Sequence, residues 1–178
     1  MKRFGLCALV LVASVSAAFA EDAKPVVVEM AGMKSTAPAT WTEEKPSSSM
    51  RFLQLKLPKA EGDKADAELA FFVFPGGSGT VEQNLKRQTD KFVEDGRTDK
   101  VAKIKVGAIE AVYQDVAGTY KKKAAPMAPD FTKVEGQRQL YVVFEDADKK
   151  QFYLTLLGPK DTVEKHKKGF EEFLKNFK

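Results

Sequence analysis

The sequence contains one cysteine, Cys7, and one histidine, His166, among its 178 residues. A zinc site draws several ligands from cysteine and histidine, and a catalytic histidine needs an orienting partner and a nucleophile beside it. Cys7 falls in an N-terminal stretch that we expect to be removed, which would leave a chain that can form no disulfide. These scarcities exclude disulfide scaffolds and thiol chemistry, and we expect no catalytic residue, metal or cofactor. Stability must come from packing.

The first twenty residues have the pattern of a secretion signal. Lys2 and Arg3 precede an apolar run over residues 4–15, and Ala-Phe-Ala at 18–20 matches a cleavage site. The apolar run is shorter than the roughly 20 residues that a bilayer span needs. We therefore predict cleavage before Glu21 and a secreted or periplasmic protein with no transmembrane segment. An uncleaved membrane anchor is the alternative.

The positive charge of the chain is low once this signal is discounted. Residues 1–20 hold two of the 29 basic residues and none of the 25 acidic ones, so the net charge falls from +4 to +2. A balance so close to neutral gives no reason to expect nucleic acid as a partner. The remaining length suits one domain over residues 34–178, preceded by a lead-in over 21–33. We expect a monomer.

Six segments are rich in β-branched and aromatic residues and predict strands. They cover residues 50–57, 68–74, 101–106, 109–121, 137–145 and 151–157, with 26–28 as a possible earlier strand. In the second, fifth and sixth of these, both alternating faces are apolar, so both need cover. The pattern predicts an α+β fold: a three-layer α/β/α sandwich with a mostly antiparallel sheet of about six strands and two main helices. Both helices on one face, with a partner on the other, is the alternative.

Two segments predict helices. Residues 80–95 place Val81, Leu85, Phe92 and Val93 on one stripe, with a capping box from Thr80 and Gln83 and a stop at Gly96. Residues 161–177 carry an apolar stripe and have Asp161 and Glu164 positioned as a second cap. The stripe comprises Val163, Phe170, Phe173, Leu174 and Phe177.

Three features that could carry chemistry have simpler interpretations. The glycine-rich turn over residues 76–80 leads into a helix N-terminus, which can hold a phosphate, but it lacks the P-loop lysine. His166 lies off the phenylalanine stripe of its helix, so we expect it to face water. Asp146 and Asp148 lack the spacing of a calcium loop, so we interpret them as a polar hairpin turn.

A partner-binding surface is predicted around the connection over residues 124–131. It has two prolines and two apolar side chains, Met127 and Phe131, and loops of this kind often carry contacts. Lys121, Lys122 and Lys123 precede it and would form a basic patch if the lysines of the last helix, Lys165, Lys167 and Lys168, lie nearby.

The order of these elements resembles the PsbP-like fold, shared by the photosystem II protein PsbP and a nuclear import factor that binds the GTPase Ran. The resemblance rests on the element order, Trp41, Thr-Val-Glu-Gln-Asn at 80–84, and the turn over 158–163. It is greatest to small secreted bacterial members without an assigned activity. It implies an α/β/α sandwich and a binding role, and it transfers no functional residue.

These observations favour a secreted, non-enzymatic binding module for a protein or cell-envelope partner. A small-ligand carrier is the first alternative, and it predicts a pocket between the sheet and a helix, lined by residues such as Phe72, Phe74 or Tyr113. A carboxylate-based hydrolase is the second, and it needs two close carboxylates in a cleft.

Overall fold

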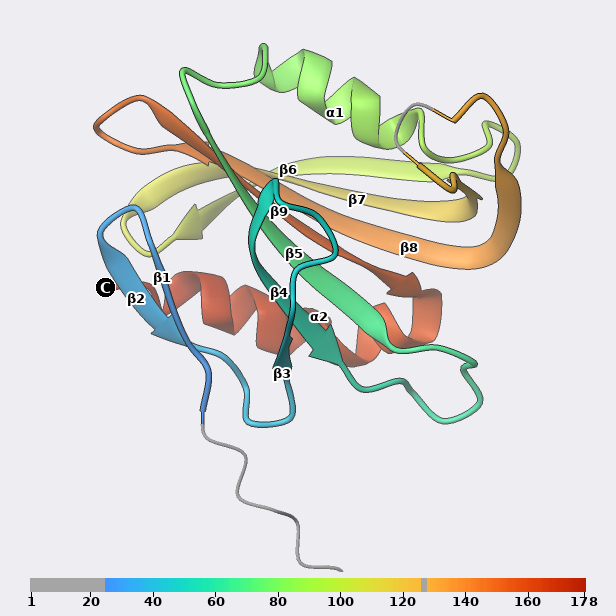
Figure 1. The fold of residues 1–178 in the computed structure, drawn as a ribbon, viewed down its shortest axis with the longest axis horizontal. Helices are drawn as coiled ribbons and strands as arrows, with labels where there is room; N and C mark the ends of the chain where they lie inside the picture. The colour runs from blue at the N-terminus through green and yellow to red at the C-terminus, as the bar shows by residue number, and fades with distance from the viewer. Residues whose placement is uncertain (1–24, 126–127) are drawn as a thin grey trace, which may run out of the picture.

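The chain forms a seven-stranded sheet, a separate two-stranded hairpin and two helices in a computed structural model that describes residues 25–125 and 128–178 (Figure 1). The signal segment, Cys7 and Met127 lie outside the described residues. The hairpin pairs β1 (Val27–Met30) with β2 (Met33–Thr36). The main sheet contains β3 (Thr42–Glu44), β4 (Arg51–Leu57), β5 (Ala67–Pro75), β6 (Thr98–Val106), β7 (Ile109–Lys122), β8 (Thr132–Glu145) and β9 (Lys150–Pro159).

The strands of the main sheet run in the order β3-β4-β5-β9-β8-β7-β6, and every neighbouring pair is antiparallel. The predicted α+β class and antiparallel sheet are confirmed, but the count of about six strands is too low. The strand missed in the main sheet is β3, which is Thr-Glu-Glu at an edge. Three polar residues carry no alternating apolar pattern, so composition alone cannot reveal such a strand.

The two helices lie on opposite sides of the main sheet (Figure 1). On β8, Tyr141 and Val143 pack with residues of α1 (Val81–Thr89), whereas Leu140 and Val142 pack with residues of α2 (Lys160–Lys175). The strand alternation explains the separation, since successive side chains point to opposite faces. The alternative with both helices on one face is therefore wrong. α1 has only nine residues, so it covers only part of its face.

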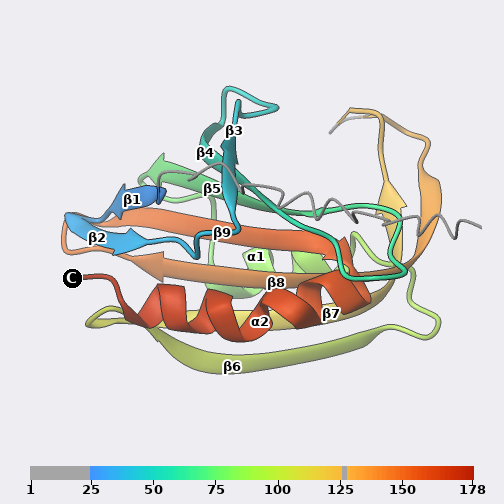
Figure 2. The ribbon, with the colours of Figure 1, turned by 90° about the horizontal axis from the view of Figure 1, so that it is seen from below.

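The main core lies between the sheet and α2, and the predicted stripe of that helix is buried there. Trp41 is also buried there and contacts Phe173 edge-on with ring centroids 5.8 Å apart. Val28 and Met30, in the segment expected to be a lead-in, join this core from the hairpin. Figure 2 shows the hairpin beside the C-terminal end of α2. Within the described ranges, no helix has the length and apolar character needed to cross a membrane.

The start of α2 is capped from a distant loop. Pro159 is the N-cap residue and supplies no side-chain hydrogen bond, while the carboxylate of Asp63 accepts one from the Thr162 N–H at 2.8 Å. The predicted cap from Asp161 and Glu164 is therefore wrong. A sequence pattern can indicate only neighbouring residues as helix caps, whereas Asp63, which caps this helix, lies 99 positions from Thr162 along the chain.

α1 begins as predicted and ends early. The capping box between Thr80 and Gln83 is present, but the helix ends at Thr89 instead of reaching Gly96. The following residues extend along β7: Val93 N–H donates to Thr119 O at 2.8 Å. Phe92 is fully buried there, against Tyr120. Pairing with the free edge of β7, beyond the end of β6, replaces the last turns of the expected helix.

His166 is buried, and the expectation that it faces water is wrong. It is 7% exposed, Trp41 Nε1 donates to its Nδ1 at 3.1 Å, and its Nε2 lies 2.8 Å from Pro58 O. An indole N–H can only donate, so Nδ1 is unprotonated and Nε2 carries the proton that is donated to Pro58. Burial lowers the pKa of His166, opposed by the bond to Pro58 and aided by the charge of Lys165.

This lowered pKa predicts that acid destabilises the fold. The unfolded chain takes up a proton at His166 near pH 6.5 while the folded chain does not, so stability is lost as the pH falls below 6.5. We expect the free energy of unfolding to drop by up to about 1.4 kcal/mol per pH unit over part of the range from 7.5 to 5.5. Urea unfolding at both pH values measures this. The same loss in His166→Gln would show that another group is responsible.

Candidate functional site

The short helix α1 leaves part of its face of the sheet uncovered. A cavity of about 220 Å³ lies there, lined by residues of the helix and of the sheet. We call it the α1 cavity. Aromatic rings from four strands line it: Phe72 and Phe74 from β5, Tyr120 from β7, Tyr141 from β8 and Tyr153 from β9. Cavities with mostly apolar and aromatic walls and a few polar groups are typical of small-molecule sites.

The strand register explains why space remains here. Ala70 on β5 pairs with Thr155 on β9, and Tyr141 on β8 is the other neighbour of Thr155. Partners in a register share a face of the sheet, so two small side chains lie side by side among larger rings. Both line the cavity.

Polar groups enter the cavity from α1 and from the middle of the sheet. Gln88 Oε1 accepts hydrogen bonds from Lys91 Nζ at 2.6 Å and from Gln139 Nε2 at 3.2 Å. Gln139 is fully buried, and its own Oε1 has no partner within the described part of the chain. An unsatisfied buried carbonyl costs about 1–3 kcal/mol, so a hydrogen-bond donor placed beside this oxygen would be stabilising.

Lys91 is the charged group with the least compensation in the α1 cavity. Burial, together with the positive charge of Arg51, lowers its pKa to about 8. The ion pairs found among residues 25–125 and 128–178 do not include Lys91. Arg51 differs because its Nη1 lies 2.6 Å from Glu68 Oε1.

The glycine-rich turn closes one end of the α1 cavity, and three of its amides are hydrogen-bonded within the fold. The Ser78 N–H donates to Tyr153 Oη at 3.2 Å, and the Thr80 N–H donates to Gln83 Oε1 at 3.1 Å. Gly77 N–H is bonded to Phe74 O at 3.0 Å. These amides are used within the fold, which favours the structural interpretation of the turn over a phosphate site.

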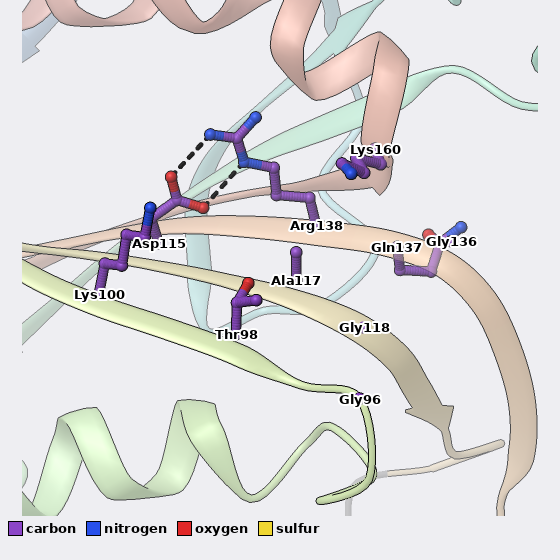
Figure 3. A pocket seen from close by; sticks show the side chains of 10 residues that line it. All are labelled: Gly96, Thr98, Lys100, Asp115, Ala117, Gly118, Gly136, Gln137, Arg138 and Lys160. Atoms are coloured by element: carbon purple, nitrogen blue, oxygen red, sulfur yellow. Dashed lines mark hydrogen bonds and ion pairs between the residues drawn. The ribbon is translucent and has the colours of Figure 1, made fainter.

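A second cavity, of about 330 Å³, lies at one end of β6, β7 and β8 (Figure 3). We call it the β6–β8 cavity. Arg138 lines this cavity, and its guanidinium donates two hydrogen bonds to the Asp115 carboxylate, from Nε to Oδ1 at 2.8 Å and from Nη2 to Oδ2 at 2.7 Å. Its Nη1 also pairs with Glu164 of α2. The buried charge of this cavity is therefore already satisfied by the protein.

The carboxylate pair of the hydrolase alternative is found in neither cavity. Glu68 is the acidic residue lining the α1 cavity, and Asp115 is the one lining the β6–β8 cavity. Each of them pairs with an arginine.

The residues predicted to bind a partner are only partly brought together. Lys121 Nζ lies 5.9 Å from the ring centroid of Phe131, which is 44% exposed. Lys122 and Lys123 are exposed beside it, and Met127 lies outside the described residues. This surface remains a predicted contact for a protein.

The lysines of α2 do not extend that patch. Lys165 Nζ donates to Lys59 O at 2.9 Å, and Lys167 pairs with Glu171 on the same helix. Lys121 instead donates to Asp90 O at 3.1 Å, next to the end of α1. Because α1 and α2 lie on opposite sides of the sheet, the lysines at 121–123 and the lysines of α2 do not form one basic patch.

The pocket of the small-ligand alternative exists, with two of its three suggested residues. Phe72 and Phe74 line the α1 cavity, whereas Tyr113 belongs to the core on the α2 side. The sequence analysis missed Gln88, Lys91 and Gln139. One usable signal was present: Gln88 follows Asn84 by four residues and Lys91 follows Gln88 by three, so the three form a polar stripe beside an apolar one.

No family model matches the chain, and no curated protein matches it significantly. The solved structures that match the chain include the following two. The solution structure of cyanobacterial PsbP from Synechocystis sp. PCC 6803 has 15% identity and a TM-score of 0.49, over 92% of this chain and 97% of that one. A Pseudomonas aeruginosa protein of unknown function, described as a putative regulator, has 14% identity and a TM-score of 0.47, over 85% and 94%. The first of these structures is a PsbP, the family that the sequence resembles.

Proposed function

We propose that this protein is an exported, non-catalytic binding protein that holds a small organic molecule in the α1 cavity. Export rests on the signal pattern of residues 1–20. Binding rests on one observation, the aromatic-lined cavity under α1, whose lining includes the unsatisfied Gln139 carbonyl.

The size of the α1 cavity suits a ring with a short substituent. Its volume is about 220 Å³, and an apolar protein cavity of roughly 150 Å³ is enough to hold benzene. The rings of Phe72, Tyr141 and Tyr153 offer flat apolar surfaces from adjacent strands. Aromatic ligands stack favourably on such surfaces.

A binding role fits the lining better than catalysis does. The serine hydroxyl of the glycine turn, Ser78 Oγ, is hydrogen-bonded to Tyr153 Oη at 2.9 Å. His166, the only histidine of the chain, is engaged by Trp41 and Pro58. The absence of a serine–histidine pair among the described residues of the lining supports the proposal of a binding role.

Filling the α1 cavity is expected to remove ligand binding. Thr155→Phe places a ring in the hollow beside Ala70, because Thr155 is only half-buried and faces the cavity. The probe is phenylacetate, an aromatic ring with a short substituent. We expect its affinity, measured by titration calorimetry, to fall about tenfold or more, because the added ring would overlap with the ligand and a packed site cannot relieve that overlap.

The matched control is Thr98→Phe, which adds the same ring at the β6–β8 cavity. Its affinity should stay within about twofold of that of the unaltered protein, since that site is independent of the α1 cavity. Melting temperatures of both variants check folding. Loss of binding in Thr98→Phe with retention in Thr155→Phe would place the ligand in the other cavity.

A further inference from the structure

The Lys91 ammonium is held in the α1 cavity without a counter-charge. Its one hydrogen bond among the described residues goes to a neutral amide, Gln88 Oε1, at 2.6 Å. A cation that is partly removed from water and left unpaired destabilises the fold. Such groups are found where function requires them.

The charges around Lys91 leave the cavity positive. Arg51 approaches from β4, and its charge is balanced by Glu68 of β5 at 2.6 Å. The remaining ionisable groups in the lining are Tyr120, Tyr141 and Tyr153. Burial raises the pKa of Tyr120 and that of Tyr141, so both are neutral near pH 7. One positive charge, that of Lys91, is therefore left for a ligand.

The apolar part of the α1 cavity adjoins this charge. Phe72, Tyr141 and Tyr153 line the same space as Lys91. Tyr141 and Tyr153 lie with nearly parallel rings, 27° apart in plane and 6.2 Å between centroids. A matching ligand has an apolar, preferably aromatic, body and a single negative group at one end.

We infer that the ligand of the α1 cavity is a small aromatic carboxylate, whose acid group pairs with Lys91 and whose ring lies among Phe72, Tyr141 and Tyr153. The inference rests on the proposed function. A phosphate ester is less suitable because a dianion needs several donors at once, and three amides of the nearby glycine turn, those of Gly77, Ser78 and Thr80, are already bonded within the fold. A carboxylate needs only the one ammonium.

Three probes of the same shape test the charge preference: phenylacetate, neutral phenylacetamide and cationic phenethylamine. Each is titrated into the full mature chain, with affinity from calorimetry and location from NMR shifts of the amides of Tyr141 and Thr155. We expect phenylacetate to bind about 10- to 100-fold more tightly than the amide, as a hydrogen bond to a charged group implies. Phenethylamine should be the weakest.

Lys91→Met should abolish the preference, leaving acid and amide within about threefold of each other, because methionine keeps the apolar stem and removes the charge. Lys103→Met is the matched control: it removes an exposed lysine of β6 that does not line the α1 cavity, and it should keep the preference. Lys91→Gln serves as a second variant, and thermal melting confirms that each is folded.

The outcomes separate the two proposals. Acid and amide that bind equally at the cavity of the unaltered protein overturn the carboxylate inference and leave the proposed function standing. A preference that survives in both Lys91 variants also overturns it. If none of the three probes shifts the Tyr141 and Thr155 amides, the proposed function itself is contradicted.

Discussion

Raising the pH from 7 to 10 is expected to weaken the binding of phenylacetate roughly a hundredfold. The free cavity holds the pKa of Lys91 at about 8, first through burial and then through the charge of Arg51. A bound carboxylate favours the charged amine and so raises that pKa. The affinity is therefore level below pH 7 and falls about tenfold per pH unit above 8, as the free protein loses the proton that binding needs.

The other ionisable groups facing Lys91 do not produce this dependence. Burial raises the pKa of Tyr120 and Tyr141, so both keep their protons over most of the range. Glu68 and Arg51 form an ion pair with each other. Calorimetry with phenylacetamide, and with phenylacetate on Lys91→Met, should show no comparable change. A level affinity for phenylacetate between pH 7 and 10 would contradict the role of Lys91.

Arg138→Met is expected to destabilise the protein by about 3–5 kcal/mol, the usual effect of removing one member of a buried ion pair. The side chains of Arg138 and Asp115 are only 12% and 17% exposed. The substitution leaves the Asp115 carboxylate with neither of its two bonds to the guanidinium, and it also frees Glu164. Urea unfolding at pH 7 measures the change from the shift of the midpoint at constant slope.

The double variant Asp115→Asn with Arg138→Met is the control for an unpaired charge. It should recover part of the lost stability because the stranded carboxylate is gone. Phenylacetate affinity should be unchanged in any folded variant of this pair, since the β6–β8 cavity is not the proposed site. A decrease of less than about 1 kcal/mol in the free energy of unfolding of Arg138→Met would contradict this prediction, because it would equal the small contribution of a surface salt bridge.

The sheet could be predicted from the sequence because its inner strands have strong patterns. All six expected segments are strands, and the unpaired register step between Gly118 and Tyr120 lies where a glycine interrupts the longest run. Helix ends were harder. Phe92 has the spacing of a helical apolar stripe, but its place against Tyr120 depends on backbone pairing between residues 91–93, which follow α1, and β7, and no local pattern indicates this pairing.

The site depended on features that are not local. Ala70 and Thr155 are unremarkable in sequence, and only the register of β5 with β9 makes them neighbours. Lys91 was not singled out from the sequence, because it falls inside the expected helix over 80–95 and its burial arises from the early end of α1 at Thr89. His166 shows the same effect: its helical position is off the phenylalanine stripe, and it is buried because Trp41 and Pro58 from other segments reach it.

A crystal structure of the mature chain with phenylacetate tests the proposed site most directly. The predicted result is a carboxylate within hydrogen-bond distance of Lys91 Nζ, at about 2.7–2.9 Å, with the ring between Phe72 and Tyr141. The contradicting result is an empty α1 cavity in crystals grown at a saturating concentration of phenylacetate, or a ligand bound beside Arg138 instead.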